Sequence, residues 1–440
     1  MYQIASHSIA YHELFVPIHR NPQSLLQTLL DIGLFSTYML YQSGSEVRIA
    51  GNALCSISVS SETISSHVMG KAQTQPIVDP LKQVESVLAS LPIEGWTAYG
   101  YVGFDMARFY SPYRKAIQQP LLHFVIPETE LRITPKGIRI RSVKPLSNIL
   151  EALSSDRLLT DYVATPPSID FADRDDYQTQ VGELIRAIQA GELHKAIISR
   201  SVKVNGAMDV LGTYYLGAKN NNAVRSYCFQ FDDVSAVGFS PEILMTVDAD
   251  QFVVTNPLAG TRPRSENLAQ DDQLNRELFT DAKEVKEHAL SIWLAQDEMS
   301  QFCLPHTVRV FDFMQVKQYR YVQHLSSRVG GQLKPGRTLW DALKVLFPGI
   351  TVSGIDKQRA LEWIDRLEAE PRGLYAGGIG WVDSRGMADI AIAIRSAYQY
   401  GTAVYLNAGA GIVAESIPQN EYLESVNKMN TMLTNLVLKS

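Results

Sequence analysis

The stretch TAVYLNAGAGI, residues 402–412, decides most about the fold. Its first half, Thr402–Asn407, is rich in strand-forming residues, and two glycines follow. From Gly409 onward the chain satisfies the dinucleotide-binding pattern G-x-G-x-x-A. However, a helix can begin only near Pro418, and about 30 residues remain after the glycines, which is too few for the second half of a nucleotide-binding fold. The stretch therefore argues against a nucleotide-dependent oxidoreductase and favours a glycine turn whose backbone N–H groups approach an anion.

Helices and strands alternate on either side of this stretch, with long strands and few tight βαβ periods. This pattern predicts an α+β fold rather than a Rossmann fold. For the last helix, Ser416 is a cap candidate and Pro418 lies near the first turn. The predicted strands are Lys195–Val204, Tyr227–Val237, Phe252–Thr255 and Ala388–Ile394, and the predicted helices are Arg276–Met299, Ala360–Glu368 and Glu421–Leu438.

A polar segment from Ser154 to Tyr177, which contains Pro166-Pro167, separates this region from the N-terminal third. The N-terminal third is mostly strand-like, and no internal repeat is visible. Its strand candidates are Trp96–Phe104, Leu121–Ile126 and Leu131–Val143, the last broken by a turn at Pro135-Lys136-Gly137.

The composition excludes several classes of protein. Of 440 residues, 40 are Lys or Arg and 46 are Asp or Glu, so the net charge is 40 − 46 = −6. A nucleic-acid-binding protein usually has a basic excess. No apolar run is long enough to span a membrane, and the N-terminus has no visible secretory signal. The three cysteines have no metal-binding spacing, and together these features predict a cytoplasmic protein.

Paired glutamates occur on two predicted helices. Glu284 and Glu287 are spaced i, i+3, and Glu421 and Glu424 repeat that spacing, with Lys428 four residues further on. If the two faces met, their like charges would require a cation, and carboxylate oxygens suit Mg²⁺. The alternative is two solvated helix faces.

Two residues could act as a base and an acid. Lys195 opens an apolar strand, where burial would disfavour its charged form and make it a general base. Alternatively, it is an edge-strand lysine that points at water. Glu242 follows an apolar strand through a tight turn, where burial would keep it protonated as a general acid. Alternatively, it lies in the N-cap region of a following helix.

Two further residues and a second glycine turn complete the set of candidate site features. Arg395 at a strand end could bind a carboxylate, or could form a structural ion pair. His324 follows an aromatic strand, and a lone histidine is more often structural than catalytic. Leu258–Arg262 contains the second glycine turn. The sequence has no H-E-x-x-H zinc motif and no G-x-S-x-G elbow. Together these residues suit a small dianionic substrate that is held partly through a metal.

Several longer segments of the C-terminal part are also distinctive: KAIISR (195–200), GFSPE (238–242), PLAGTR (257–262), KEVKEH (283–288), QHL (323–325), LFPGITVSG (346–354), PRGLY (371–375) and AGAGI (408–412). They resemble the chorismate-utilising enzymes, the family of anthranilate, aminodeoxychorismate, isochorismate and salicylate synthases. The resemblance runs from about Tyr177 to the C-terminus. The N-terminal third, residues 1–165, matches loosely, best at Gly100–Phe104.

The resemblance implies one unit over residues 1–440, with residues 170–440 as the catalytic part. It implies two large, mainly antiparallel sheets that pack face to face, with helices outside. The implied roles are a base at Lys195, an acid at Glu242 and a third catalytic residue at His324. Mg²⁺ would be bound by Glu287 and Glu424, with Glu284 and Glu421 close by. Substrate would be bound by Gly260, Thr261, Thr351, Tyr375, Arg395, Gly409, Gly411 and Lys428.

Within the family, the Phe347–Ile355 segment and Gln323 look like salicylate synthases, which convert chorismate to salicylate and pyruvate through isochorismate. Ala259 replaces the nucleophilic lysine of aminodeoxychorismate synthases. Asn256 and Asp356 depart from the salicylate synthase pattern, where Glu and Pro are usual. The product would serve siderophore synthesis, and no glutaminase subunit is expected. Isochorismate synthase, anthranilate synthase component I and a non-catalytic small-anion-binding protein remain as alternatives.

Overall fold

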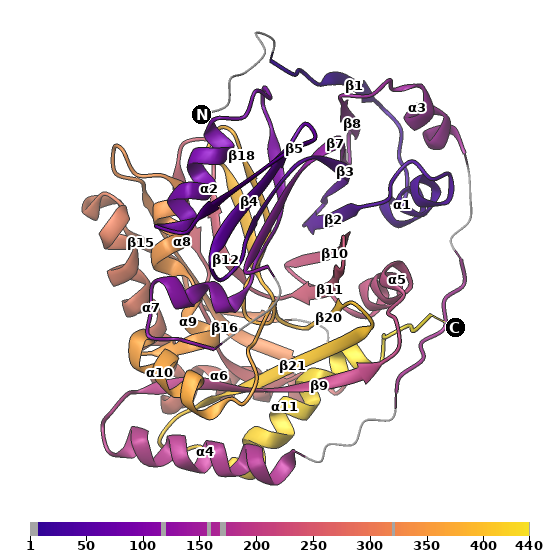
Figure 1. Ribbon diagram of the computed structural model, residues 1–440. Helices are drawn as coiled ribbons and strands as arrows, with labels where there is room; N and C mark the ends of the chain where they lie inside the picture. Colours follow the sequence, from indigo (N-terminus) through magenta and orange to yellow (C-terminus); the bar gives the residue numbers. More distant parts are fainter. Residues whose placement is uncertain (1–7, 116–119, 156–159, 168–172, 319–321, 440) are drawn as a thin grey trace.

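The computed structural model describes residues 8–115, 120–155, 160–167, 173–318 and 322–439. Within these ranges the chain is a mixed α+β structure with antiparallel strand pairing, as the sequence predicts. Figure 1 shows the strands in the centre and helices around them. No helix in the described ranges is long and apolar enough to cross a membrane. The three cysteines are buried free thiols.

The strands form two layers. In the first layer neighbouring strands pair in the order β1 (His12–Val16), β8 (Gly137–Ser142), β7 (Leu122–Thr134), β3 (Glu46–Val59), β2 (Tyr38–Ser43), β10 (Arg225–Phe231), β11 (Val234–Ser240), β20 (Ser396–Tyr400), β21 (Ala403–Ile412), β9 (Lys195–Asn205) and β17 (Gly354–Ile355).

The second layer uses the other ends of β3 and β7. Its order is β5 (Lys71–Pro76), β4 (Thr63–Val68), β3, β7, β6 (Thr97–Val102), β18 (Gly378–Asp383), β19 (Ala388–Ile392), β12 (Ile243–Val247), β13 (Phe252–Thr255) and β16 (Val322–Gln332). One edge of β16 pairs with β13 and β14 (Leu258–Pro263), and its other edge pairs with β15 (Arg309–Gln318).

The two long strands β3 and β7 therefore belong to both layers. Their register shifts between Ala53 and Cys55, next to Asn52, whose φ of +54° is left-handed. The layers pack face to face through aromatic and polar contacts. The rings of Tyr101 and Phe229 lie 5.7 Å apart, and the Tyr41 hydroxyl donates to Asp389 at 2.8 Å. The predicted pair of facing sheets is confirmed, with the addition that two bent strands join them.

Helices cover the outer faces of the layers. Leu26 and Leu211 lie in one buried cluster with Leu40 of β2 and Cys228 of β10, so α1 and α5 pack on the first layer. In Figure 1, α1 and α5 lie to the right of the strands and α2, α7 and α8 to the left. The helices are α1 (Pro22–Asp31), α2 (Pro80–Ala89), α3 (Ser147–Ser154), α4 (Arg174–Gln189), α5 (Val210–Asn220), α6 (Leu268–Thr280), α7 (Ala282–Phe302), α8 (Leu339–Leu346), α9 (Ile350–Ser353), α10 (Lys357–Leu367) and α11 (Pro418–Leu433), with 3₁₀ turns at Phe104–Phe109 and Pro305–Thr307.

Three predicted elements differ in the structure. The strand predicted over Tyr227–Val237 is a hairpin of β10 and β11, which turns at Asp232, where φ is +44°. The long helix predicted over Arg276–Met299 is broken at Asp281, whose carboxylate accepts from the Glu284 N–H at 3.3 Å. The predicted glycine turn after Asn407 is wrong, because β21 continues to Ile412.

The cap prediction for the last helix is also wrong. The N-cap of α11 is Ile417, and the Ser416 hydroxyl instead accepts from the Val413 N–H at 3.1 Å. Pro418 is the first helical residue, as predicted.

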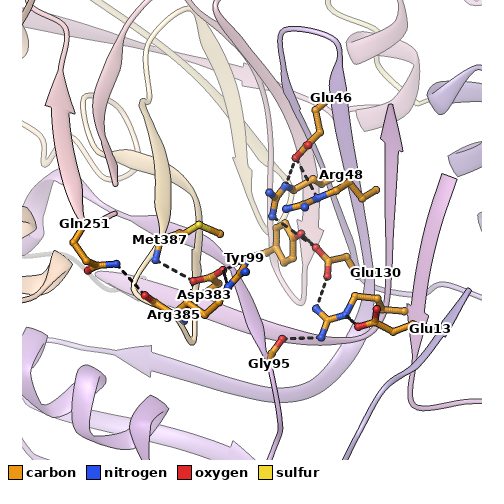
Figure 2. A network of polar contacts seen from close by, with 12 residues as sticks. Glu13, Glu46, Arg48, Gly95, Tyr99, Glu130, Gln251, Asp383, Arg385 and Met387 are labelled. Atoms are coloured by element: carbon orange, nitrogen blue, oxygen red, sulfur yellow. Dashed lines mark hydrogen bonds and ion pairs between the residues drawn. The ribbon is translucent and has the colours of Figure 1, made fainter. Parts of the chain in front are cut away.

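Buried charges join the N-terminal strands to each other and to β18. Glu130 on β7 is 4% exposed, and it accepts from the Tyr99 hydroxyl and from Arg141 at 3.1 Å. Arg48 lies 3.8 Å from Glu130 and stacks 3.7 Å over the ring of Trp381 on β18. Figure 2 shows this network. Because each buried charge has an opposite partner, the network avoids the cost of an isolated buried ion.

The N-terminal third shares sheets with the C-terminal part. β2 pairs with β10 along residues 38–43, and β6 pairs with β18 along residues 97–102. The polar segment around Pro166-Pro167 connects α3 and α4. Its residues 156–159 and 168–172 lie outside the described ranges. A fragment of residues 1–165 would lose both sets of strand partners.

We therefore expect the 1–165 fragment to lack a stable fold, because two of its strands would become unpaired edges. Far-UV circular dichroism and thermal unfolding of the fragment, beside the full chain as control, would measure this. A cooperative unfolding transition of the fragment alone would contradict the expectation.

Candidate active site

Residues of both layers line one cavity of about 190 Å³. One side of the cavity is formed by β9, β21 and α11, which lie together in Figure 1. The side chain of Thr261 lies outside what the structure describes, and its backbone pairs with His324. All the other predicted site residues line the cavity: Lys195, Glu242, Gly260, Glu284, Glu287, His324, Thr351, Tyr375, Arg395, Gly409, Gly411, Glu421, Glu424 and Lys428.

Lys195 is the first residue of β9 and is 6% exposed, so it is not an edge lysine that points at water. Its Nζ donates to Glu287 on α7. Gly411 lies beside it on β21, and a Cβ at Gly411 would come within 2.8 Å of the lysine Cε. Glycine at this position therefore leaves room for the Lys195 side chain to extend along the cavity wall.

Glu242 lies just beyond β11, and the strand β12, rather than a helix, follows it. The Ser240 hydroxyl accepts from the Glu242 N–H at 3.2 Å, and the Leu258 N–H donates to the Glu242 carboxylate at 3.3 Å. Burial raises the pKa of Glu242 to about 7, although hydrogen bonds from Thr351 and Leu258 lower it in part. Near neutral pH the carboxyl therefore retains a proton that it can donate.

Gly260 is a bulge in β14 with φ of +68°, and a Cβ there would lie 2.9 Å from the Glu284 carboxylate. Its carbonyl accepts from Nδ1 of His324 at 3.1 Å. Burial, helped by the nearby charge of Arg395, lowers the pKa of His324 to about 4. His324 is therefore neutral at pH 7, with its proton on Nδ1.

Arg395 is the residue before β20, and its φ of +52° is a strained conformation for a non-glycine residue. Burial lowers the pKa of Arg395, which lies near Tyr375 and Glu424. Its backbone carbonyl accepts from the Phe239 N–H at 3.0 Å, but its side chain makes no hydrogen bond or ion pair within the described ranges, so the structural ion pair considered above is absent there. A guanidinium that faces a cavity in this way is suited to bind a carboxylate.

The glycines of β21 lie in an extended strand. A Cβ at Gly409 would come within 2.5 Å of the Ile198 carbonyl, so close strand packing requires glycine there. The Gly409 N–H is directed at the Tyr375 oxygen, and its carbonyl accepts from Lys428 at 2.8 Å. Burial raises the pKa of Tyr375 to about 12, so its hydroxyl stays protonated. These backbone groups face the cavity as predicted, although they belong to a strand.

The four glutamates share the cavity, as the resemblance implies, and are not simply solvated helix faces. Three have cationic partners: Glu287 binds Lys195, Glu284 binds Arg262 at 3.2 Å and Glu424 binds Lys428 at 2.6 Å. Lys428 is also the main cause of the lowered pKa of Glu424. Among the described residues, no three His, Cys, Asp or Glu side chains are arranged to hold a metal. A metal would therefore bind only if carboxylates turned away from these cations.

Sequence reasoning missed two residues that shape the cavity. Arg372 is 1% exposed, pairs with Glu368, and donates to the carbonyls of Val352 at 2.7 Å and Ile197 at 2.6 Å. It fixes α9 and β9 next to the cavity, and its place in the PRGLY segment was the available signal. Asn407 lines the cavity and accepts from a tyrosine hydroxyl at 2.6 Å, but nothing in the sequence marks it.

A family model described as chorismate binding enzyme matches residues 36–434. The chain is similar to a salicylate synthase from Mycolicibacterium paratuberculosis, with 32% identity over 442 residues that cover 96% of each chain. It is also similar to an anthranilate synthase component 1 from Haloarcula marismortui, with 40% identity over 267 residues, 60% of this chain and 50% of that one.

A solved structure is similar over most of the length. The crystal structure of anthranilate synthase component I from Streptococcus pneumoniae superposes with a TM-score of 0.79 at 29% identity, and covers 89% of this chain and 92% of that one. Because the family match includes every element that lines the cavity, the chain belongs to the family of chorismate binding enzymes.

Proposed function

We propose that the protein is a salicylate synthase, which converts chorismate to isochorismate and then to salicylate and pyruvate. The observation that carries the proposal is that Lys195 and Glu242, a buried lysine and a buried carboxyl whose pKa is raised to about 7, line the same cavity. The salicylate synthase is similar along 96% of this chain, whereas the anthranilate synthase of Haloarcula marismortui matches 60% of it and that of Streptococcus pneumoniae 89%. Salicylate would then supply siderophore synthesis in the cytoplasm.

The first step would add water at C2 and remove the 4-hydroxyl. Lys195, in its neutral amine form, would take a proton from the attacking water, and Glu242 would donate one to the departing hydroxyl, which leaves as water. One proton is taken and one is given, so the step needs no external reductant or oxidant. The imidazole of His324 is neutral and is held by its hydrogen bond to the Gly260 carbonyl. It would orient the six-membered ring of the substrate.

Arg395 and the Tyr375 hydroxyl would donate to the pyruvyl carboxylate, and the Gly409 N–H, which is directed at the Tyr375 oxygen, would position that hydroxyl. Gly411, Gly260, Thr261 and Thr351 would line the ring, and Lys428 would support the glutamates. The second step, loss of pyruvate, would be pericyclic and would depend on a held conformation more than on an acid or a base.

The carboxylates of Glu284, Glu287, Glu421 and Glu424 provide the oxygen donors that Mg²⁺ prefers. When bound, Mg²⁺ would offset the repulsion between these glutamates and the ring carboxylate of the substrate. Glu284, Glu287 and Glu424 would each exchange a lysine or arginine partner for the metal if they bound it. No glutaminase partner is needed for this reaction.

Anthranilate synthase component I is the second candidate, and the 40% identity to the Haloarcula marismortui protein favours it. An isochorismate synthase would stop after the first step, and an anion-binding protein would bind without turnover.

Purified protein with chorismate and Mg²⁺ separates these possibilities. We expect pyruvate and fluorescent salicylate without ammonia. Isochorismate alone, a product formed only with ammonia, or binding without turnover would each select a different alternative.

We expect Arg395→Lys to raise the KM for chorismate roughly 10- to 100-fold, because a two-point charged contact becomes a single one. The kcat should change less, since Arg395 is placed away from the reacting C2 and C4. Steady-state kinetics would measure both, with the exposed Arg359→Lys as control. An unchanged KM would show that Arg395 does not bind the substrate carboxylate.

A further inference from the structure

A second, smaller cavity lies behind Glu242. It measures about 20 Å³, which is room for one water molecule. Glu242 and Thr351 line both this rear cavity and the main one, and Glu298 of α7 lines the rear cavity only. The rear cavity therefore connects the proposed acid with a carboxylate to which the mechanism above gives no role.

Glu298 is itself unusual. It is 6% exposed and binds Lys357 of α10. Lys357 also donates to the carbonyls of Val345 at 3.1 Å and Leu346 at 3.3 Å, at the end of α8. Burial raises the pKa of Glu298, which makes its protonated form more accessible. Stability alone is a weak reason for a buried ion pair, because desolvation offsets much of the attraction.

Thr351 stands between the two cavities. Its hydroxyl is buried beside Glu242 and has no other hydrogen-bond partner within the described ranges. A hydroxyl can donate to one group while it accepts from another, so Thr351 can link Glu242 to a water in the rear cavity.

We propose that Glu242 is reprotonated from behind, through one water in the rear cavity that Thr351 and the Glu298–Lys357 pair hold. This inference rests on the proposed acid role of Glu242. After each turnover Glu242 lacks a proton and Lys195 carries an extra one. Lys357 gives a proton to Glu298, Glu298 passes it through the water to Glu242, Lys357 regains a proton from solvent, and Lys195 releases its extra proton to solvent, so the count balances. The route leaves the main cavity free for product and substrate.

The test is Glu298→Gln, which keeps the size of the side chain but cannot pass on a proton. The first turnover uses the proton already on Glu242, so stopped-flow should show a burst of about one product per active site. Later turnovers should slow 10-fold or more, with kcat and KM falling together so that kcat/KM is unchanged, and small buffer acids such as imidazole should restore the rate. The control is Asp297→Asn, which removes an equal charge from a neighbouring exposed residue of the same helix. This variant should show no burst and no slowing of later turnovers.

Gly349→Ala provides a second variant that removes no charge. Gly349 and Ile392 both line the rear cavity. A Cβ at Gly349 would lie 2.9 Å from the end of the Ile392 side chain and would therefore narrow this cavity. The variant should reproduce the burst. An equal loss in the first and later turnovers, without buffer rescue, in both variants would overturn the proposal. Failure of the wild-type protein to turn over chorismate would instead contradict the proposed function.

Discussion

Lys195→Ala is expected to lower the rate of water addition to chorismate roughly 10²- to 10⁴-fold, the usual contribution of a general base. Lys195 is buried at the cavity wall, and Gly411 makes the space through which its side chain extends. Pyruvate release from supplied isochorismate should fall much less, because that step needs no base. Separate assays with chorismate and with isochorismate would measure the two rates.

The control for this prediction is Lys203→Ala, an exposed lysine of the same strand, which should keep both activities. Because Lys195→Ala leaves Glu287 without its cation, its folding should be checked by thermal unfolding, with Lys195→Gln as a variant that keeps a donor. An equal loss of both steps in a folded variant would argue that Lys195 positions substrate and is not the base.

Glu242→Gln is expected to reduce water addition by a similar factor, because the amide cannot donate the proton that the departing hydroxyl needs. In the wild-type protein the carboxyl, with a pKa of about 7, is protonated below pH 7 and loses its proton as the pH rises through 7. The rate should therefore fall on the alkaline side with an apparent pKa near 7, and this limb should be absent in the variant. Rate profiles from pH 5.5 to 9 would show it.

A matched control is Asp250→Asn, which alters an exposed acid near the start of β13 and should leave the profile unchanged. If Glu242→Gln retained the wild-type rate and the same alkaline limb, another group would have to be the acid.

The sequence predicts the site better than the elements around it. The apolar run after Lys195 and the turn before Glu242 are local signals, and both residues line the cavity. The break at Asp281 could not be predicted, because Arg262 binds its carboxylate at 2.6 Å from a distant strand. A helix-forming sequence can thus be interrupted by a tertiary contact.

The role of the glycines of β21 also depends on tertiary contacts that the sequence does not reveal. In sequence, Gly409 and Gly411 indicate a turn, since glycine is typical of turns. Their physical reason is the close approach of the Ile198 carbonyl and the Lys195 side chain, which only the fold brings there. The ion pairs of Glu287 and Glu284 likewise depend on α7 meeting β9 and β14, whereas Glu424 and Lys428 pair within α11.

The two departures from the salicylate synthase pattern lie outside the cavity lining. The Asn256 amide donates to Ser326 at 3.0 Å and to the Ser327 carbonyl at 2.7 Å, so it holds the segment before β14 to β16. Asp356 has a φ of +40°, which proline cannot adopt, and its carboxylate contacts His194 at 2.9 Å. Both substitutions have local structural roles.

In the proposed reaction, this cavity adds water to chorismate before pyruvate leaves. Turnover in ¹⁸O-labelled water, followed by mass spectrometry of the aromatic product, tests it most directly. We predict salicylate that carries one ¹⁸O atom in its hydroxyl group, because that oxygen would come from the water that Lys195 activates. Unlabelled hydroxybenzoate, or an aminated product, would contradict the account.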